Sequence, residues 1–402
     1  MILSHQIRLA PTKAQEEYFR CACGTARFTY NWALAEWKRL YGAGEKPSGW
    51  GLKKQFNAIR REEFPWTYDV HRDCTGRSFD DLQNAYKHFF RRLKLGQNPG
   101  YPKFKKKGSG DSFYITNYLL RLNNKRVRIP VLGWVQMREP LRYEGKVMGA
   151  TVKRVANRWM LSIRVDVGDY NRPRISDKIV GVDLGAKTLA TLSTGEKIEG
   201  PKALRKSLKR LKRLSRWHSR KKPGSANRKK AAQKLARLHC RVADIRSEAL
   251  NVLTTRLCRE NQVVGIEDLD VEGMLRNRYL ALSISDMGFG EFRRQMAYKS
   301  KIYDTELRIA DRYFPSSKTC SVCGNIKKDL KLSDRIFKCN NCGVSLDRDL
   351  NAALNLRNLP AVSREVTPVE IKALAETRKR VSETSVMEAG TCVSEYLNSF
   401  VG

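Results

Sequence analysis

Four cysteines near the C-terminal end constrain the fold of this chain more than any other feature. They are spaced as C-x2-C-x15-C-x2-C, at Cys320, Cys323, Cys339 and Cys342. Two CxxC pairs at this separation can enclose one tetrahedral Zn²⁺ with four thiolates. Because four thiolates leave no open position for water, we expect a structural zinc in a small ribbon. An acidic motif that contains Asp349 follows this ribbon directly.

The charge of the chain predicts a polyanionic partner. The 402 residues, enough for two to four domains, include 78 Lys and Arg against 41 Asp and Glu, a net charge of +37. Such an excess repels itself unless an anion offsets it, and phosphates do so with release of counterions. We therefore expect nucleic acid. An anionic membrane is the disfavoured alternative, because no apolar run is long enough to span a bilayer and no lipidation motif occurs.

The remaining cysteines favour a reducing compartment. Met1 leads directly into an alternating stretch and not into a charged start with a long apolar segment, so we expect no secretory signal and a cytoplasmic protein. The cysteines outside the ribbon are scattered, and we expect them to be free thiols: Cys21, Cys23, Cys74, Cys240, Cys258 and Cys392.

The N-terminal part reads as a sheet into which helices are inserted. Residues 2–9 alternate like a strand, Thr12 is a helix cap, and we expect the aromatic residues of the helices that follow to be core. Strand 2–9 is expected to rejoin a later sheet. The expected elements are helices at 14–43 and 78–93, strands within 112–170, and a hairpin of 147–155 and 158–167 that turns at Ala156-Asn157.

The C-terminal part alternates short buried strands with helices. Residues 201–250 hold 18 Lys and Arg against two acids and are broken at Pro223, which predicts two antiparallel basic helices. Residues 361–402 hold six acids and five basic residues, and we expect a disordered tail there. The other expected elements are strands at 178–185, 188–193, 263–269 and 306–310, and helices at 288–303 and 349–357.

Three acids stand at the ends of apolar elements, namely Asp183, Glu267 and Asp349. Two strands and a helix that carry acids in this way are typical of an RNase H-like sheet. Two Mg²⁺ about 3.5–4 Å apart can promote hydrolysis of a phosphodiester, and Mg²⁺ prefers carboxylate oxygens and water as ligands. The sequence thus predicts a two-magnesium nuclease site, although a strand often ends in an acid merely because loops are polar.

Several motifs carry a resemblance to a known family. The chain resembles the TnpB family, also called OrfB, whose members are encoded by transposons and are related to type V CRISPR effector nucleases. The resemblance covers about residues 1–357. It rests on Gly181-Val182-Asp183-Leu184-Gly185, Gly265-Ile266-Glu267-Asp268-Leu269, residues 280–286, 314–320 and 347–353, with N-terminal support from residues 24–31 and 101–104.

The resemblance implies a mixed fold, with an α/β nuclease domain of the RuvC type beside all-β and α-helical lobes. The domains that we expect are a wedge-like β domain at 1–11 plus 111–175, a helical recognition domain at 12–110, a RuvC-like domain at 176–315 plus 343–360, the zinc ribbon at 316–342, and the tail at 361–402.

The resemblance also implies an activity, namely RNA-guided, Mg²⁺-dependent cleavage of double-stranded DNA beside a short motif. The guide RNA would derive from the end of an insertion sequence, and a monomer would bind it in a prokaryotic cytoplasm, on the nucleoid. Asp183, Glu267 and Asp349 would hold the magnesium ions, while Asp347 would cap the helix and Arg335 would stabilise transition-state charge. Phosphate contacts are expected from Arg72, Lys103, Lys105, Lys106, Lys209, Arg213, Arg220 and Lys221.

Two other functions stay open. A transposase that acts on its DNA ends without RNA would use the same acids, and a guided DNA-binding repressor would not cleave. The intact set of three acids disfavours the repressor. The five histidines include no His-x-His pair, which argues against a single-strand transposase of the tyrosine class. The stretch 72–77 departs from the glutamine-type residue with which relatives read the flanking motif, so the motif stays unassigned.

Overall fold

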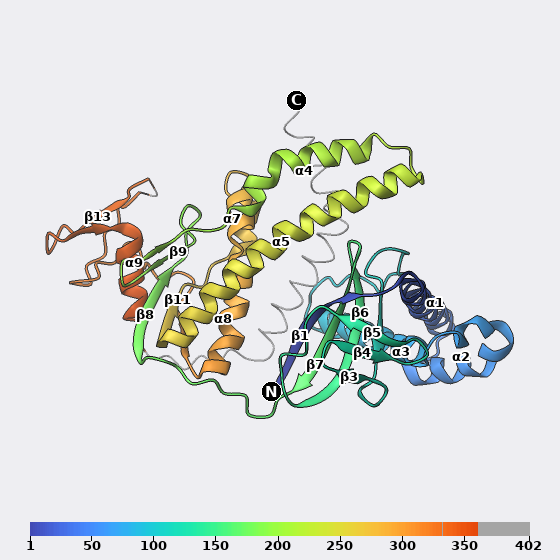
Figure 1. Cartoon of the computed structure of the whole chain (residues 1–402). Helices are drawn as coiled ribbons and strands as arrows, with labels where there is room; N and C mark the ends of the chain where they lie inside the picture. The colour runs from blue at the N-terminus through green and yellow to red at the C-terminus, as the bar shows by residue number, and fades with distance from the viewer. Residues whose placement is uncertain (332, 361–402) are drawn as a thin grey trace. The chain divides into compact units, whose positions relative to one another are not determined.

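The computed structural model describes residues 1–331 and 333–360, and the predicted disordered tail lies outside them. The chain forms two compact units, Met1–Asp169 and Tyr170–Gly402 (Figure 1). The predicted helical domain falls in the N-terminal unit, as does the wedge-like domain except for its residues 170–175, whereas the predicted nuclease domain and ribbon fall in the C-terminal unit. The boundaries within each unit stay predictions.

A seven-stranded sheet forms the base of the N-terminal unit, in the order β2-β6-β7-β1-β5-β4-β3. Strand β1 (Ile2–Ala10) lies in its middle and pairs antiparallel with β7 and β5, which confirms that the first strand joins the later sheet. The predicted hairpin is also confirmed, and Ala156 turns it with a φ of 55°. The other strands are β2 (Ser112–Ile115), β3 (Arg121–Asn123), β4 (Arg126–Ile129), β5 (Gly133–Met137), β6 (Lys146–Val155) and β7 (Arg158–Asp166).

Three α-helices and a short 3-10 helix (Pro65–Tyr68) stand between β1 and β2. Helix α1 (Lys13–Gly42) begins with a capping box in which Thr12 and Gln15 bond each other's backbone, as the Thr12 prediction implied. Helix α3 (Asp73–Lys94) begins five residues earlier than predicted. Helix α2 (Gly49–Glu63) was not predicted, because Pro47, two early glycines and a charged second half obscure its short apolar stripe.

Aromatic residues fill the core between these helices, as predicted. Trp37 and Tyr86 stack with ring centroids 4.2 Å apart, and Phe56 and Phe79 are fully buried beside them. Phe19 of α1 instead packs against Trp159 of the sheet, at 5.0 Å. The aromatic residues of α1 thus join the helices to one another and to the sheet.

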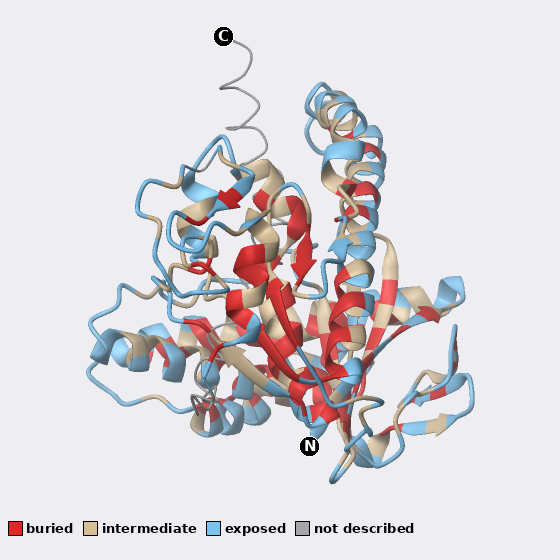
Figure 2. Cartoon of the chain, turned by 90° about the vertical axis from the view of Figure 1, so that its left-hand side faces the viewer, coloured by how far each residue is buried: buried red, intermediate tan, exposed pale blue. Residues whose placement is uncertain are grey.

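A five-stranded sheet of order β10-β9-β8-β11-β12 forms the centre of the C-terminal unit. Strands β8, β11 and β12 are parallel neighbours, whereas β9 runs antiparallel to both of its neighbours, β8 and β10. In Figure 2 the buried residues, drawn in red, gather on the central strands and on the helices beside them. The strands are β8 (Lys178–Asp183), β9 (Ala190–Leu192), β10 (Lys197–Ile198), β11 (Asn261–Ile266) and β12 (Glu306–Ile309), which confirms the predicted ones and adds β10.

Helices α4 (Ala203–Ser219) and α5 (Ala226–Glu260) form the predicted antiparallel basic hairpin (Figure 1). Asp286, which is buried, accepts hydrogen bonds from the backbone N–H groups of Leu204 and Arg205 at 2.8 and 2.9 Å and so caps α4. The guanidinium of Arg246 on α5 bonds the carbonyl of Ser285. The motif at 280–286 therefore fixes the base of the hairpin.

The remaining helices of this unit are α6 (Val271–Arg276), α7 (Ala281–Met287), α8 (Phe289–Tyr303) and α9 (Arg348–Arg357). No helix within residues 1–331 and 333–360 is long and apolar enough to cross a membrane.

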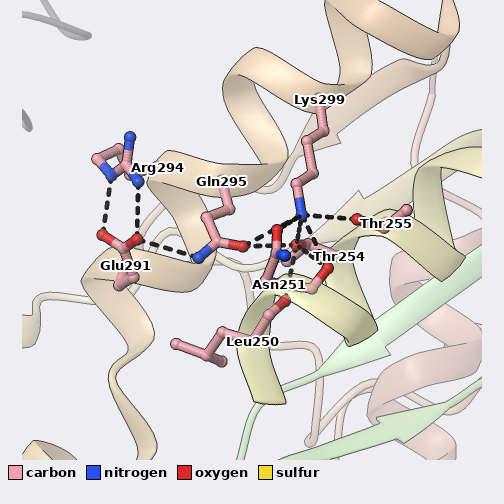
Figure 3. A network of polar contacts seen from close by, with 8 residues as sticks. All are labelled: Leu250, Asn251, Thr254, Thr255, Glu291, Arg294, Gln295 and Lys299. Carbon is pink, nitrogen blue, oxygen red and sulfur yellow. Dashed lines mark hydrogen bonds and ion pairs between the residues drawn. The ribbon is translucent and has the colours of Figure 1, made fainter. Parts of the chain in front are cut away.

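Helix α8 packs against α5 through a buried lysine (Figure 3). The Lys299 ammonium donates to Asn251 Oδ1 at 2.6 Å and to the hydroxyls of Thr254 and Thr255 at 2.8 Å. Burial lowers the pKa of Lys299 to about 8. Neutral oxygens thus surround a cation that has no carboxylate partner within this network.

Candidate active site and zinc ribbon

The first two acids lie side by side at one edge of the sheet. Asp183 is the last residue of β8, and Glu267 follows β11 directly. Val182 and Ile266, the residues before them, are partners in the parallel register. Because parallel strands end at the same edge, the two carboxylates come from adjacent strand ends although 84 positions separate them in the sequence.

Helix α9 brings the third acid to this edge, and two glycines admit the helix. A Cβ atom at Gly181 would overlap the carbonyl oxygen of Ala353, and a Cβ atom at Gly265 would overlap that of Leu356. The backbone of α9 thus lies directly on β8 and β11, which any larger residue at these positions would prevent. Asp349 stands in the first turn of this helix.

The three carboxylates form one electrostatic cluster. Burial raises the pKa of Asp183 well above its usual range, and the charges of Glu267 and Asp349 raise it further. The pKa of Glu267 is raised by burial and by Asp349, while a hydrogen bond from the Ser316 hydroxyl opposes the shift. Nearby carboxylates disfavour one another's ionised forms, and a bound cation would stabilise these forms. Carboxylate oxygens are the ligands that a hard ion such as Mg²⁺ prefers.

The three acids do not form a group of ligand atoms as compact as that of the four cysteines. Among the residues described, the four cysteines are the only group of three or more His, Cys, Asp or Glu whose ligand atoms all lie within 4.8 Å of one another. A pair of Mg²⁺ ions that keep several waters requires no closer approach of the carboxylates. The residues fit such a pair, and their roles as ligands stay a prediction.

The four cysteines form a compact tetrad with the geometry of a zinc site. Cys320 and Cys342 lie 3.6 Å apart between sulfur atoms, as do Cys323 and Cys339. Both CxxC pairs turn in the same way. Gly324 and Gly343, each directly after the second cysteine of its pair, have a φ of 74°. Their N–H groups donate to the carbonyls of the first cysteines, Cys320 and Cys339, at 2.9 and 3.1 Å. The donor set fits structural Zn²⁺.

The ribbon continues directly into α9. Its hairpin pairs β13 (Ile336–Lys338) with β14 (Ser345–Asp347), and α9 begins at the next residue. Asp347 caps α9 by accepting from the N–H groups of Asp349 and Leu350 at 3.0 and 3.1 Å, as predicted. Lys197 also donates to Asp347 at 2.8 Å. The ribbon therefore sets the start of the helix that carries Asp349.

Two asparagines on α9 bind the entry of the ribbon. Asn355 donates to the carbonyls of Ser316 and Thr319, both at 2.7 Å, and Asn351 donates to Thr319 at 2.7 Å. Ser316 also donates to Glu267. These contacts, which were not predicted, join the ribbon, α9 and Glu267. The spacing of two asparagines four positions apart on one helix face was the available signal.

The sequence alone did not single out Arg348, a cation beside the acids. Arg348 lies 3.4 Å from Asp349 and lowers the pKa of Asp183, a role that was not predicted. The exposed Arg335 contributes its backbone carbonyl, which accepts from the Arg348 N–H at 2.8 Å. A catalytic role for the Arg335 side chain stays a prediction.

The predicted phosphate contacts fall into two groups on the two units. Arg72, Lys103, Lys105 and Lys106 are exposed residues of the N-terminal unit, and Arg72 also lies over the ring of Tyr118. In the basic hairpin Lys209, Arg213 and Arg220 are exposed, while Lys221 is half-buried. Lys221 and Lys234 both lie over the half-buried ring of Trp217, at 5.3 and 5.0 Å. The contacts of these residues with phosphate stay predictions.

Comparison with protein families gives matches along most of the chain. Residues 162–278 match the OrfB_IS605 family, described as "Probable transposase", and residues 289–356 match the Cas12f1-like TNB domain. Residues 1–46 match a family described as a helix-turn-helix domain, although this segment forms β1 and the single helix α1 here.

Curated relatives match nearly the whole chain. A protein of Streptomyces pristinaespiralis named "Putative RNA-guided DNA endonuclease" is 37% identical over 354 residues, which cover 87% of each chain. Escherichia coli K12 "Putative RNA-guided DNA endonuclease InsQ" is 33% identical over 87% of this chain and 90% of its own length. The Cas12f1 chain of a solved "Cas12f1-sgRNA-target DNA complex" has the same fold, with a TM-score of 0.57, 17% identity and coverage of 86% of this chain and 83% of that chain. The chain therefore belongs to the IS605 OrfB family, also called TnpB, of RNA-guided DNA endonucleases.

Proposed function

We propose that the protein is an RNA-guided, Mg²⁺-dependent DNA endonuclease encoded by an insertion sequence, which cuts DNA beside a short motif. One observation carries the proposal most. Asp183, Glu267 and Asp349, from three distant segments, share one electrostatic cluster at the edge of a mixed sheet. The sheet order, with three antiparallel strands followed by two parallel ones, supports an RNase H-like nuclease domain of the RuvC type.

The three acids would act as ligands of two magnesium ions. When bound, such ions activate a water molecule and stabilise the leaving oxygen of a phosphodiester. The pKa values of Asp183 and Glu267 are raised, so their ionised forms are disfavoured without a bound cation. Binding of Mg²⁺ would favour the ionised forms and would therefore be coupled to the release of protons. Arg348 holds Asp349 from one side, and Ser316 orients Glu267 by its hydrogen bond.

Partners follow from relatives and from charge. The curated relatives are named RNA-guided DNA endonucleases, and the solved Cas12f1 chain is in complex with sgRNA and target DNA. By analogy, a guide RNA from the end of the insertion sequence and double-stranded target DNA would bind this chain as a monomer. The basic hairpin supports a contact with backbone phosphates of RNA or of a heteroduplex, which such proteins recognise by shape.

A direct transposase is the second candidate, because the matched OrfB_IS605 family carries the description "Probable transposase". A transposase would require only its DNA ends, so dependence on RNA separates the two functions. A guided repressor without cleavage is disfavoured, since the three acids that cleavage requires are all present and clustered.

The test substitutes one acid and compares cutting with binding. Asp183→Ala should abolish Mg²⁺-dependent cutting of a guide-matched plasmid and leave guided binding intact, because the substitution removes a metal ligand and no phosphate contact. Asp177→Ala is the matched control, because Asp177 lies just before β8 and its side chain is 80% exposed. Cutting by Asp183→Ala protein would contradict the assignment of the site, and RNA-independent cutting of element ends would favour the transposase.

A further inference from the structure

The segment 101–107 of the N-terminal unit carries two exposed aromatic rings in a row of lysines. Tyr101 and Phe104 are 41% and 49% exposed, whereas Tyr86, against which Tyr101 packs, is buried. Four lysines and no acid accompany them in this segment. The segment has no regular secondary structure, so these rings are not exposed as part of an amphipathic helix or strand.

Hydrogen bonds hold this segment in place along its length. Asn31 of α1 brackets Lys105, since its side chain donates to the Lys105 carbonyl at 3.0 Å and accepts from the Lys105 N–H at 2.8 Å. The hydroxyl of Tyr86 bonds that of Tyr101 at 3.3 Å. Farther along, Asp111 accepts from the Gly108 N–H at 3.2 Å. The two rings are therefore presented on a preformed support and need no ordering when a ligand binds.

Positive charge surrounds both rings. The Lys38 ammonium lies 4.9 Å from the ring centroid of Phe104 and 5.7 Å from that of Tyr101. The acid nearest in the chain, Asp111, is already paired with Arg27 at 3.1 Å. Apolar rings among cations complement a ligand that joins a flat base to a phosphate, because bases stack on aromatic rings and phosphates pair with lysines.

We propose that Tyr101, Phe104 and Lys38 form a stacking platform for an unpaired nucleotide of the guide RNA, and that Asn31 positions this platform. The inference rests on the proposed function. RNA is the favoured occupant because a guide RNA presents unpaired bases before any target is bound, whereas duplex DNA must first be opened. A preformed platform suits the ligand that is present first.

The experiment uses the full-length chain purified with the RNA from its native flanking DNA. Phe104→Leu keeps an apolar side chain but removes the stacking face, and Phe104→Tyr keeps the ring. Leucine should weaken binding of the transcribed RNA about fivefold or more, as loss of a stacked base does, while tyrosine should leave it unchanged. Asn31→Asp, which repels the Lys105 carbonyl, should weaken binding in the same direction.

Ultraviolet cross-linking provides a readout that a merely structural role would not produce. No acid lies between Asp81 and Asp111, so a protease that cleaves after acids releases residues 82–111 as one peptide. This peptide should carry cross-linked RNA in the wild-type complex and lose it in the Phe104→Leu complex.

Three results would contradict the inference. Unchanged RNA affinity and no cross-link on residues 82–111, beside normal guided cutting by the wild type, would overturn it alone. A loss confined to single-stranded DNA binding would assign the platform to DNA and overturn the RNA assignment. Absence of any copurified RNA would contradict the proposed function itself, and this inference with it.

Discussion

Gly181 and Gly265 are partners in the parallel register of β8 and β11, and the backbone of α9 lies over both of them. Each glycine stands two positions before a candidate metal ligand, Asp183 or Glu267. The missing side chains thus set how closely the helix that carries Asp349 approaches the two strand ends. A pair of glycines far from one another in sequence determines the geometry of the acid cluster.

Substitution of Gly265 should lower the rate of cutting by more than a loss of folded protein would explain. In Gly265→Ala protein the added methyl group would overlap the Leu356 carbonyl, so α9 must move away from the sheet. A displacement of about 1 Å at a catalytic group can cost about 100-fold in rate. We expect a loss of guided cutting of this order in a protein that still binds RNA. Gly290→Ala is the control, because nothing lies within 4 Å of its added Cβ, and equal effects of both substitutions would contradict this account.

Loss of the zinc should impair cutting through α9. Cys339→Ser removes one thiolate, which should loosen the ribbon and with it the bonds from Asn351 and Asn355 to Thr319. Zinc content should fall and cutting should decrease by at least about tenfold, as measured by metal analysis and plasmid cleavage. The exposed Cys21→Ser serves as the control. Normal cutting by a zinc-free protein would show that the ribbon does not position Asp349.

The buried Lys299 should make stability depend on pH between about 8 and about 10.4. The folded-state pKa of Lys299 is lowered to about 8, below the usual 10.4, so the unfolded chain binds more protons in this window. Stability contributed by Lys299 therefore rises as pH increases through the window. The urea midpoint of the wild type should rise relative to that of Lys299→Met from pH 7.5 to pH 9.5. Lys301→Met, on the exposed face of α8, should follow the wild type. A difference that does not change with pH would contradict the burial of a charged lysine.

Binding of RNA should depend steeply on salt. If about ten phosphates are neutralised, the logarithm of affinity should fall with the logarithm of salt concentration at a slope near −9. Arg213→Ala in the basic hairpin should lower this slope in magnitude by about 1, and Lys301→Ala on α8 should not. Filter binding at four salt concentrations measures both, and a flat response would contradict the electrostatic interpretation.

Features that depend on residues close together in the sequence were predicted well. Thr12 and Asp347 act as the caps that they resemble, and the cysteine spacing predicted the tetrad, because these features depend on residues close in sequence. The three acids lie near one another, since parallel strands end at a common edge and α9 begins beside it, while their roles as metal ligands stay a prediction. Helix α2 was not predicted, since its apolar positions at Leu52 and Phe56 are too few to give a helical period.

The contacts that hold the site together depend on tertiary packing and so could not be read from spacing. The bond between Ser316 and Glu267 joins residues 49 positions apart, and the bracket between Asn31 and Lys105 spans 74. Ser316, Glu267 and Asn31 lie in motifs that resemble the family, and Lys105 directly follows one, but the motifs alone did not say which atoms these residues contact. For polar residues inside such motifs, tertiary packing and not local propensity determines which atoms they contact.

The most direct test of the account is to sequence the RNA that copurifies with the chain when it is expressed beside its native flanking DNA. We expect one discrete RNA from the end of the element, whose variable part directs Mg²⁺-dependent cutting of a matching plasmid. If no RNA is enriched over background, guided recognition is contradicted, and the acid cluster would belong to a nuclease or transposase that acts without RNA.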